Sequence, residues 1–294
     1  MNLRVQQWIK AWKRLRLECT CRVIVGGALI SVLLACSGAG NQETLTVFAA
    51  ASLTQALAEV GAEFEKEHPE YSIVLTFDGS QRLRIQLEHG AVADLFASAD
   101  ERQMDLAEES GLLATDAVYF ASNYLVVAVS SRARAPVDSL IDLAHADVKL
   151  VLAHPEAPAG RYALSVIDSL ATSPNFGPAY SARLMENVVS QEPNVRGVLQ
   201  KVALGEADAG FVYASDALTA ENISTLLVPE EVNIAAIYPV AMLRTAVDKN
   251  AVEDFIQFLI SPRSQRILQD HGFGPIPSQA GSKSRGLTGA HTES

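Results

Sequence analysis

The sequence predicts an α/β protein built from two lobes, and three observations support this. Short β-rich runs alternate with amphipathic helical windows from Thr44 onwards, which is typical of parallel sheets with helices on both faces. The strand–helix units are more numerous than one compact sheet of about 150 residues needs. Hydrophobic residues make up 49% of the 294-residue chain, enough for a substantial core.

Between residues 45 and 111, the alternation begins with a predicted strand at 45–49 and a predicted helix at 53–68. Leu53, Leu57, Val60 and Phe64 recur in this window at helical spacing. Strands at 71–77 and 94–98 alternate with helices at 80–90 and 101–111, and Gly90 and Gly111 close those two helices.

The rest of the chain continues in the same way. We expect strands at 124–130, 149–153 and 209–214 and a pair around 234–243, with helices at 137–144, 160–171, 195–207, 251–261 and 262–273. The predicted lobes are 44–122 plus 239–277 and 123–238, joined by two crossovers near 122–123 and 238–239. The tail 278–294 lacks apolar periodicity and is expected to be disordered. A cleft between the lobes is the expected ligand site.

The first 35 residues predict a signal peptide. Six basic residues precede or flank a run of thirteen apolar residues, Val23 to Ala35, which suits a signal-peptide core and is too short to span a bilayer. The ending LLAC resembles a lipoprotein lipobox, which makes Cys36 the lipidated residue and 36–43 a tether. The alternative is an ordinary secretory signal that contains a cysteine. Either interpretation places the protein outside the cytoplasm, and the lipoprotein interpretation anchors it to a membrane.

The charge and the cysteines exclude several classes of site. The formal charge is −11, and removing the leader, with six basic residues and one acid, leaves −16. This argues against nucleic acid and anionic membrane surfaces as partners. Because all three cysteines lie at or before Cys36, the mature domain has no thiol for a disulfide, a thiolate metal site or a nucleophile.

The usual catalytic and phosphate-binding motifs are absent from the sequence. The six histidines have no metal-ligand spacing, and His154 near Glu156 is interpreted as a loop contact. We therefore expect no cofactor.

Small or hydroxyl residues recur where strands lead into helices. The junctions are Ser52, Gly79-Ser80, Pro158-Ala159-Gly160 and Pro193-Asn194-Val195. A helix N-terminus has unpaired N–H groups and a partial positive charge, which together suit an anion. At each junction the alternative is ordinary: Ser52 can be a helix cap, and glycine and proline commonly mark loop ends.

Five segments resemble one known family. In chain order these are VFAAASLTQAL, TFDGSQRLRIQLEHGAVADLFASAD, PEAPAGRYA, NVRGVL and AGFVYASDA. Together they are similar to the periplasmic molybdate-binding proteins of ABC importers, from about Thr44 to Gly274. The resemblance implies a two-lobed periplasmic solute-binding fold, each lobe a mostly parallel sheet flanked by helices, with two interlobe crossovers.

The resemblance also implies a ligand and a set of contacts. The ligand is molybdate or tungstate, held by hydrogen bonds without a counter-charge and passed to an ABC importer permease by a monomeric binding protein. The matching hydroxyls are Ser52, Ser80 and Tyr213, and the matching backbone N–H groups are those of Ser52, Ser80, Ala159 and Val195. Molybdenum is then bound only as the oxyanion. Tyr213 otherwise looks like a core aromatic, although a buried ring can leave its hydroxyl in a cleft.

Several charged residues near these positions need an interpretation. Arg82 and Arg196 each follow a predicted contact residue, and we expect both to face solvent. Three carboxylates, Asp94, Asp100 and Asp216, match family positions, but they would repel a dianion, so we interpret them as helix caps or lobe contacts.

Three other functions stay open. One is a sulfate- or phosphate-type binding protein. Another is an enzyme on a related two-lobed fold that uses Ser52 or Ser80 as nucleophile, although no neighbouring motif supplies a base. The third is a surface adhesin or sensor that no longer binds a ligand.

Overall fold

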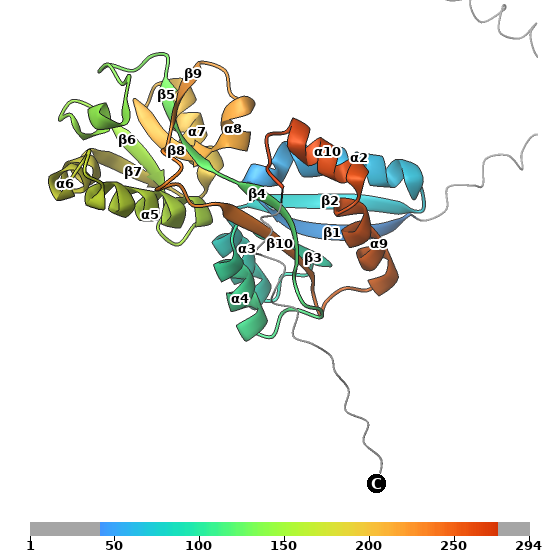
Figure 1. Cartoon of the computed structure of the whole chain (residues 1–294). Coiled ribbons are helices and arrows are strands. Elements are labelled where there is room, and N and C mark those ends of the chain that lie inside the picture. Colours follow the sequence, from blue (N-terminus) through green and yellow to red (C-terminus); the bar gives the residue numbers. More distant parts are fainter. Residues whose placement is uncertain (1–41, 276–294) are drawn as a thin grey trace, which may run out of the picture. The chain divides into compact units, whose positions relative to one another are not determined.

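A computed structural model describes residues 42–275, which form two five-stranded sheets with flanking helices (Figure 1). The predicted signal peptide 1–35, Cys36 with most of the tether, and the predicted tail 278–294 lie outside the described residues.

The first sheet has the strand order β2-β1-β3-β10-β4. Its strands are β1 (Glu43–Ala50), β2 (Tyr71–Asp78), β3 (Leu95–Ala97), β4 (Val118–Asn123) and β10 (Ala236–Met242). Four strands run in one direction and β10 runs against its neighbours. The helices packed on or beside it are α2 (Thr54–Glu67), α3 (Ser80–Glu88), α4 (Glu101–Glu109), α9 (Lys249–Leu259) and α10 (Pro262–Asp270). We call this sheet and these helices the first lobe.

The second sheet has the order β7-β6-β8-β5-β9. Its strands are β5 (Leu125–Ser130), β6 (Leu150–Ala153), β7 (Val188–Glu192), β8 (Ala209–Tyr213) and β9 (Ile223–Leu227), with β5 as the reversed strand. The helices of this second lobe are η2 (Leu140–Ala144), α5 (Pro158–Thr172), α6 (Pro178–Glu186), α7 (Val195–Leu204) and α8 (Ala214–Leu218).

The predicted α/β class and the two mostly parallel, helix-flanked sheets are confirmed. The chain leaves the first sheet between β4 and β5 and returns between β9 and β10 (Figure 1). The return ends before Ala236, slightly earlier in the chain than the predicted position at 238–239.

Five elements were not predicted from the sequence, namely β4, α6, β7, α8 and β9, and the pair of strands expected around 234–243 is the single strand β10. β7 and β9 contain only intermediate and exposed residues, so neither has the buried apolar run that marked the other strands. The short helix predicted at 137–144 is the 3₁₀ helix η2, closed at its start by a capping box between Ser139 and Asp142.

Strand register brings distant loops together. β1 and β2 pair in parallel from Glu43 with Tyr71 to Ala50 with Asp78, so both strands end side by side. β6 pairs in parallel with β7 up to Ala153 and Glu192, and with β8. Since the carboxyl ends of parallel strands meet at one sheet edge, the loops after β1 and β2 are neighbours, as are the loops after β6, β7 and β8.

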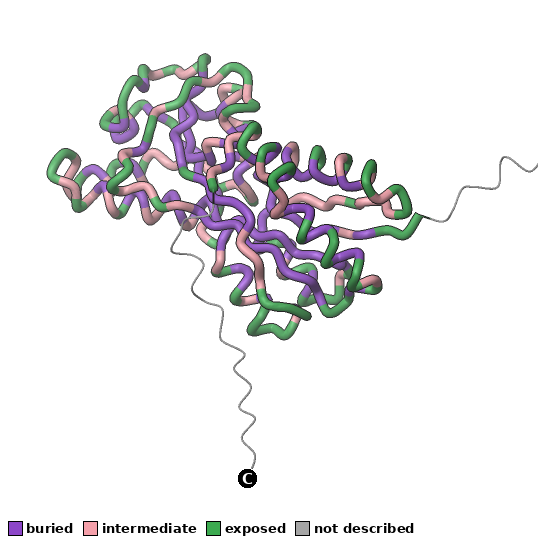
Figure 2. Tube along the Cα trace, turned by 45° about the vertical axis from the view of Figure 1, so that its right-hand side comes forward, coloured by how far each residue is buried: buried purple, intermediate pink, exposed green. Residues whose placement is uncertain are grey.

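The core lies mainly along the strands, most of which are buried, whereas β2, β7, β9 and the outer helix faces are more exposed (Figure 2). A large cluster of buried apolar side chains extends through both lobes, and a smaller one under α3 and α4 contains Phe48, Leu83, Phe96 and Met104. Within residues 42–275, no helix is both long and apolar enough to cross a membrane.

Gly210 in β8 offers a test of how tightly the second lobe is packed. A Cβ at this position would lie 2.7 Å from Val198 Cγ1 and 2.8 Å from the Val151 carbonyl oxygen. We expect Gly210→Ala to lower the free energy of unfolding by about 1–3 kcal/mol, the usual cost of overpacking, as measured by urea denaturation.

The matched control is Gly61→Ala in α2, where the nearest atom is Ile73 Cγ2 at 3.4 Å. This change should be neutral or stabilising by up to about 1 kcal/mol, because alanine is the better helix former. Equal unfolding free energies for the two variants would contradict the packing assigned to β8.

Candidate functional site

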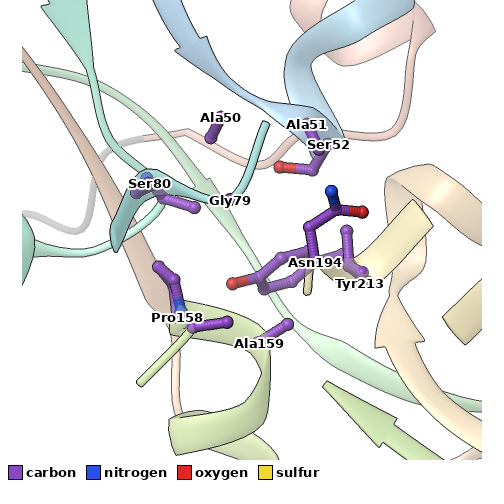
Figure 3. Close-up of a pocket in the computed structure, with 12 residues that line it drawn as sticks. Ala50, Ala51, Ser52, Gly79, Ser80, Pro158, Ala159, Asn194 and Tyr213 are labelled. Atoms are coloured by element: carbon purple, nitrogen blue, oxygen red, sulfur yellow. The ribbon is translucent and has the colours of Figure 1, made fainter. Parts of the chain in front are cut away.

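A small pocket lies where the loops at the two sheet edges meet, and it contains about 230 Å³ of space not filled by atoms. Both lobes contribute to its walls (Figure 3). The lining residues are Ala50, Ala51, Ser52, Gly79, Ser80, Ala99, Ala157, Pro158, Ala159, Asn194, Val195 and Tyr213. All twelve are uncharged, and most are small, so backbone atoms form much of the wall.

Three helices begin at this pocket. Each follows a strand of its sheet: α3 starts at Ser80, α5 at Pro158 and α7 at Val195. The N–H groups of a first helical turn have no acceptor within the helix. At α7 the Asn194 side chain accepts only from Gly197 N, at 3.2 Å, so the N–H of Val195 stays available. The N–H groups of Ser80 and Ala159 occupy equivalent first-turn positions in α3 and α5.

Close approach of the backbone explains two glycines at these helix starts. A Cβ on Gly79 would lie 2.8 Å from the Pro193 carbonyl oxygen of the other lobe, and a Cβ on Gly160 would lie 2.1 Å from the His154 carbonyl oxygen. Larger residues at either position would push the helix ends away from the pocket.

Ser52 lies in the short 3₁₀ helix η1 (Ala51–Leu53), which leads directly into α2. Neither η1 nor α2 has a side-chain cap, so the interpretation of the Ser52 hydroxyl as a helix cap is wrong. Its Oγ lies 3.0 Å from the hydroxyl oxygen of Tyr238. Figure 3 shows this oxygen on the pocket side of the residue, facing the space between Gly79 and Asn194.

Ser80 and Tyr213 present two further hydroxyls. Ser80 Oγ accepts a hydrogen bond from Ala99 N at 3.0 Å, which leaves its own O–H free to donate. Tyr213 is 1% exposed, and its hydroxyl has no hydrogen-bond partner among the described residues. Figure 3 shows the phenol oxygen directed into the pocket between Ser80 and Pro158. A buried hydroxyl without a partner is costly, so this group is arranged for something that enters the pocket.

Burial raises the pKa of Tyr213 well above its ordinary value, and the nearby Tyr238 and Tyr162 raise it further. The phenol therefore keeps its proton at neutral pH and can act as a donor. The three helix N-termini add partial positive charge. The pocket thus combines neutral donors and positive dipole ends with no side-chain cation in its wall.

All five residues predicted to contact a ligand, Ser52, Ser80, Ala159, Val195 and Tyr213, line this one pocket. Their contact with a ligand stays a prediction. Cys36 lies outside the described residues.

Sequence reasoning missed Tyr238, the partner of Ser52, because the two residues are 186 positions apart. The one available signal was a phenol within the buried strand β10, where all seven residues are buried.

The two arginines behave differently. Arg82 is half exposed, and its Nε lies 3.2 Å from Asp78 Oδ2 at the end of β2, in line with the expectation that it faces solvent. The same expectation for Arg196 is wrong. Its Nε lies 2.9 Å from Asp216 Oδ1 and donates to the Ala51 carbonyl at 3.3 Å, and its Nη2 contacts Gln55 Oε1. Arg196 turns towards the first lobe because these oxygens lie beside the start of α7.

Of the three carboxylates, Asp100 is a helix cap and a lobe contact, as interpreted from the sequence, whereas Asp94 and Asp216 make contacts within their own lobes. Asp94 accepts from the backbone N–H groups of Thr46 and Val247. Asp100 caps α4 through Gln103 N and pairs with Arg161 across the lobes. Asp216, fully buried, has its ionic contact with Arg196.

His154 makes the expected loop contact, since its Nδ1 lies 3.2 Å from Glu156 N. Among residues 42–275, no group of three or more His, Cys, Asp or Glu side chains could hold a metal ion.

Polar contacts join the two lobes around the pocket. Asn194 Nδ2 donates to Asp78 Oδ1 and Gln81 Nε2 donates to the Pro193 carbonyl, both at 2.8 Å. Two ion pairs extend this rim: Arg161 with Asp100 at 2.9 Å and Arg102 with Glu156 at 3.1 Å. The structure therefore shows the lobes closed over the pocket.

Known proteins share both the sequence and the fold of this chain. The molybdate-binding protein ModA of Mycobacterium tuberculosis is 33% identical over 261 residues, covering 85% of this chain and 95% of that protein. A Bacillus subtilis protein, YvgL, named as an ABC transporter substrate-binding lipoprotein, is 29% identical, covering 84% and 95%.

A solved structure agrees with these relatives. A substrate-binding domain from Clostridium difficile, assigned to a molybdenum ABC transporter, is 30% identical with a TM-score of 0.60 and covers 80% of this chain and 99% of that domain. The family profile described as bacterial extracellular solute-binding protein matches residues 45–274. The chain therefore belongs to the bacterial extracellular solute-binding proteins.

Proposed function

We propose that this chain captures molybdate or tungstate in the pocket between its lobes and delivers it to an ABC importer. The observation that carries the proposal is the buried, unpartnered hydroxyl of Tyr213 at the point where three helix N-termini meet. The names of the M. tuberculosis relative and the C. difficile domain support the same ligand.

Neutral donors suit a fully ionised oxyanion. Burying a dianion is unfavourable unless its oxygens are hydrogen-bonded. The pocket offers the hydroxyls of Ser52, Ser80 and Tyr213 and the backbone N–H groups at three helix starts, and these can reach four oxygens. Helix dipoles supply favourable potential without a buried cation.

Donors that keep their protons also select against a protonated anion, because its O–H group would need an acceptor. Phosphate carries a proton at neutral pH, so it should bind poorly. Sulfate is fully ionised, but it is a smaller tetrahedron, and donors fixed by helix ends should fit it loosely. The pocket thereby distinguishes oxyanions by protonation and by size.

Closure of the lobes links binding to delivery. The donors come from both lobes, so a bound oxyanion stabilises the closed arrangement already held by the polar rim, Asn194 with Asp78 among its contacts. A permease that recognises the closed form would then accept only loaded protein. This role needs no catalysis: the Ser52 and Ser80 hydroxyls face a phenol and a backbone amide, neither of which is a general base.

The proposed place of action is outside the cytoplasm, as the family description indicates. Lipidation of Cys36 would hold the domain at the membrane surface near its permease, and the relative YvgL is named as a lipoprotein. Mass spectrometry of the membrane fraction from cells expressing the full chain, compared with a Cys36→Ser variant, tests this anchor.

The ligand prediction is tested by calorimetry of the mature domain with molybdate, tungstate, sulfate and inorganic phosphate. We expect dissociation constants below about 1 μM for the first two, corresponding to more than about 8 kcal/mol, and much weaker binding of the others. Sulfate affinity equal to that for molybdate would contradict the size argument, and no binding of any of the four anions would contradict the function.

Tyr213→Phe tests the residue that carries the proposal. Hydrogen bonds to charged groups contribute about 1.5–3 kcal/mol, so molybdate affinity should fall about 10- to 100-fold. The ligand-free variant should melt at the same temperature as the wild type or higher, since it lacks a buried hydroxyl without a partner. Unaltered molybdate affinity would remove Tyr213 from the site.

The buried carboxyl group of Asp216 makes the stability of the fold depend on pH. Burial raises the pKa of Asp216 from 3.8 to about 7, and Arg196 lowers it by a smaller amount. The folded protein therefore retains a proton that the unfolded chain releases between about pH 4 and pH 7. The contribution of the Asp216 carboxyl group to the free energy of unfolding is therefore present in full below about pH 4, and it is lost as the pH rises through about 7.

Asp216→Asn removes this titration. Between pH 5 and pH 8 we expect the melting temperature of the ligand-free wild type to fall more than that of Asp216→Asn. Differential scanning calorimetry at several pH values measures both. Identical pH profiles would show that Asp216 is already ionised throughout this range.

A further inference from the structure

Behind the pocket wall, two buried hydroxyls face each other. Ser52 Oγ lies 3.0 Å from Tyr238 Oη, and the two side chains come from η1 and β10. Tyr238 is fully buried and is not one of the residues that line the pocket. Because each hydroxyl has a single hydrogen, the direction of this bond decides what Ser52 can offer to a ligand.

The surroundings of Tyr238 favour one direction. Its ring packs edge-to-face against Phe120, Tyr213 and Phe273. In the part of the chain that the structure describes, the Tyr238 hydroxyl hydrogen-bonds to Ser52 Oγ, and the Asn123 side chain lies near it. If Ser52 donated to Tyr238, the phenolic hydrogen would be buried with no acceptor, a costly arrangement.

The side chain of the neighbouring Asn123 already contacts two other groups. Its Oδ1 accepts from Tyr124 N at 2.9 Å, and its Nδ2 donates to Ser215 Oγ at 2.7 Å. Burial raises the pKa of Tyr238 well above its ordinary value; hydrogen bonding to Ser52 and to Asn123 lowers it, and the buried Asp216 raises it. The phenol therefore keeps the hydrogen that it needs to donate.

We infer that Tyr238 is a positioning residue that donates to Ser52 Oγ and so directs the Ser52 hydrogen into the pocket. This inference rests on the proposed function, since a bound oxyanion is then the acceptor for Ser52. With Tyr238 as donor behind it, Ser52 presents its hydrogen to the ligand. If Ser52 instead accepted from a protonated ligand, its own hydrogen would be left without an acceptor.

Tyr238 is thus a specificity-determining residue that does not touch the ligand. It favours oxyanions without a proton, such as molybdate, over anions that carry one, such as hydrogen phosphate. Tyr238→Phe removes one oxygen atom and leaves the aromatic packing in place. In that variant Ser52 has no donor behind it and is free to rotate and accept.

The experiment is a double-mutant cycle of Tyr238→Phe and Ser52→Ala, with molybdate and inorganic phosphate binding measured by calorimetry. We expect Tyr238→Phe alone to weaken molybdate binding about tenfold, the range of one intramolecular hydrogen bond. Phosphate binding should stay level or improve, so discrimination between the two anions falls. In the Ser52→Ala background, Tyr238→Phe should have no further effect on molybdate binding.

Tyr180→Phe is the matched control. Tyr180 is also buried, and its hydroxyl donates to the Leu140 carbonyl within the second lobe, away from the pocket. It should lower the melting temperature through its lost hydrogen bond and leave the affinities for both anions unchanged. Melting curves of all variants separate losses of folding from losses of binding.

Two results would overturn the inference. One is molybdate binding by Tyr238→Phe equal to that of the wild type. The other is an equal loss in the wild-type and Ser52→Ala backgrounds, which would mean that Tyr238 acts on packing rather than through Ser52. The molybdate affinities of the double-mutant cycle test the inference even if phosphate binding is too weak to measure. A wild type that binds none of the anions would contradict the proposed function as well, so the two failures are distinguishable.

Discussion

The unpaired N–H groups at the first turns of α3, α5 and α7 are the feature on which the rest of the structure depends. These groups can hold an anion only if three helix ends meet at one point. Parallel pairing of β6 with β7 ends these two strands side by side and so brings the starts of α5 and α7 together, and the closed lobes place the start of α3 opposite them. Small residues such as Ala50 and Ala51 in the pocket wall then leave the backbone accessible.

Each sheet has one strand that runs against its neighbours, and these two strands position tyrosine side chains at the site. β10 returns the chain to the first sheet antiparallel to β3 and β4, and in doing so it places Tyr238 beside Ser52. β5 pairs antiparallel with β8 along Leu125 to Val129, which holds the strand that ends at Tyr213. The connections between the lobes therefore also position the hydroxyls of the pocket.

Much of this could be predicted from local sequence. Ser80, Ala159 and Val195 lie at strand–helix junctions, where the change from one period to the other is visible in the chain. Tyr213 was found only through the resemblance to known proteins, because a tyrosine at the end of a buried strand looks like part of the core. Weakly buried strands such as β7 and β9 were missed because they lack an apolar run.

Contacts between distant residues were beyond local sequence reasoning. The partner of Ser52 is 186 residues away, and Arg196 contacts Gln55 and Ala51 of the other lobe. Arg196 was expected to face solvent because an anion held by helix dipoles needs no fixed charge, and only the closed lobes bring the Ala51 and Gln55 oxygens within its reach. Pairings of this kind follow from the arrangement of the two lobes, which no segment of the sequence specifies alone.

The most direct test of the account is a crystal structure of the mature domain with molybdate, in which anomalous scattering locates the molybdenum atom. The account predicts one molybdenum in the pocket, with its oxygens about 2.7–3.2 Å from the backbone nitrogens of Ser80, Ala159 and Val195. The Tyr213 hydroxyl should lie at a similar distance, and no side-chain cation should touch the anion. Molybdenum bound elsewhere, or held by the Arg82 or Arg196 guanidinium group, would contradict recognition by neutral donors.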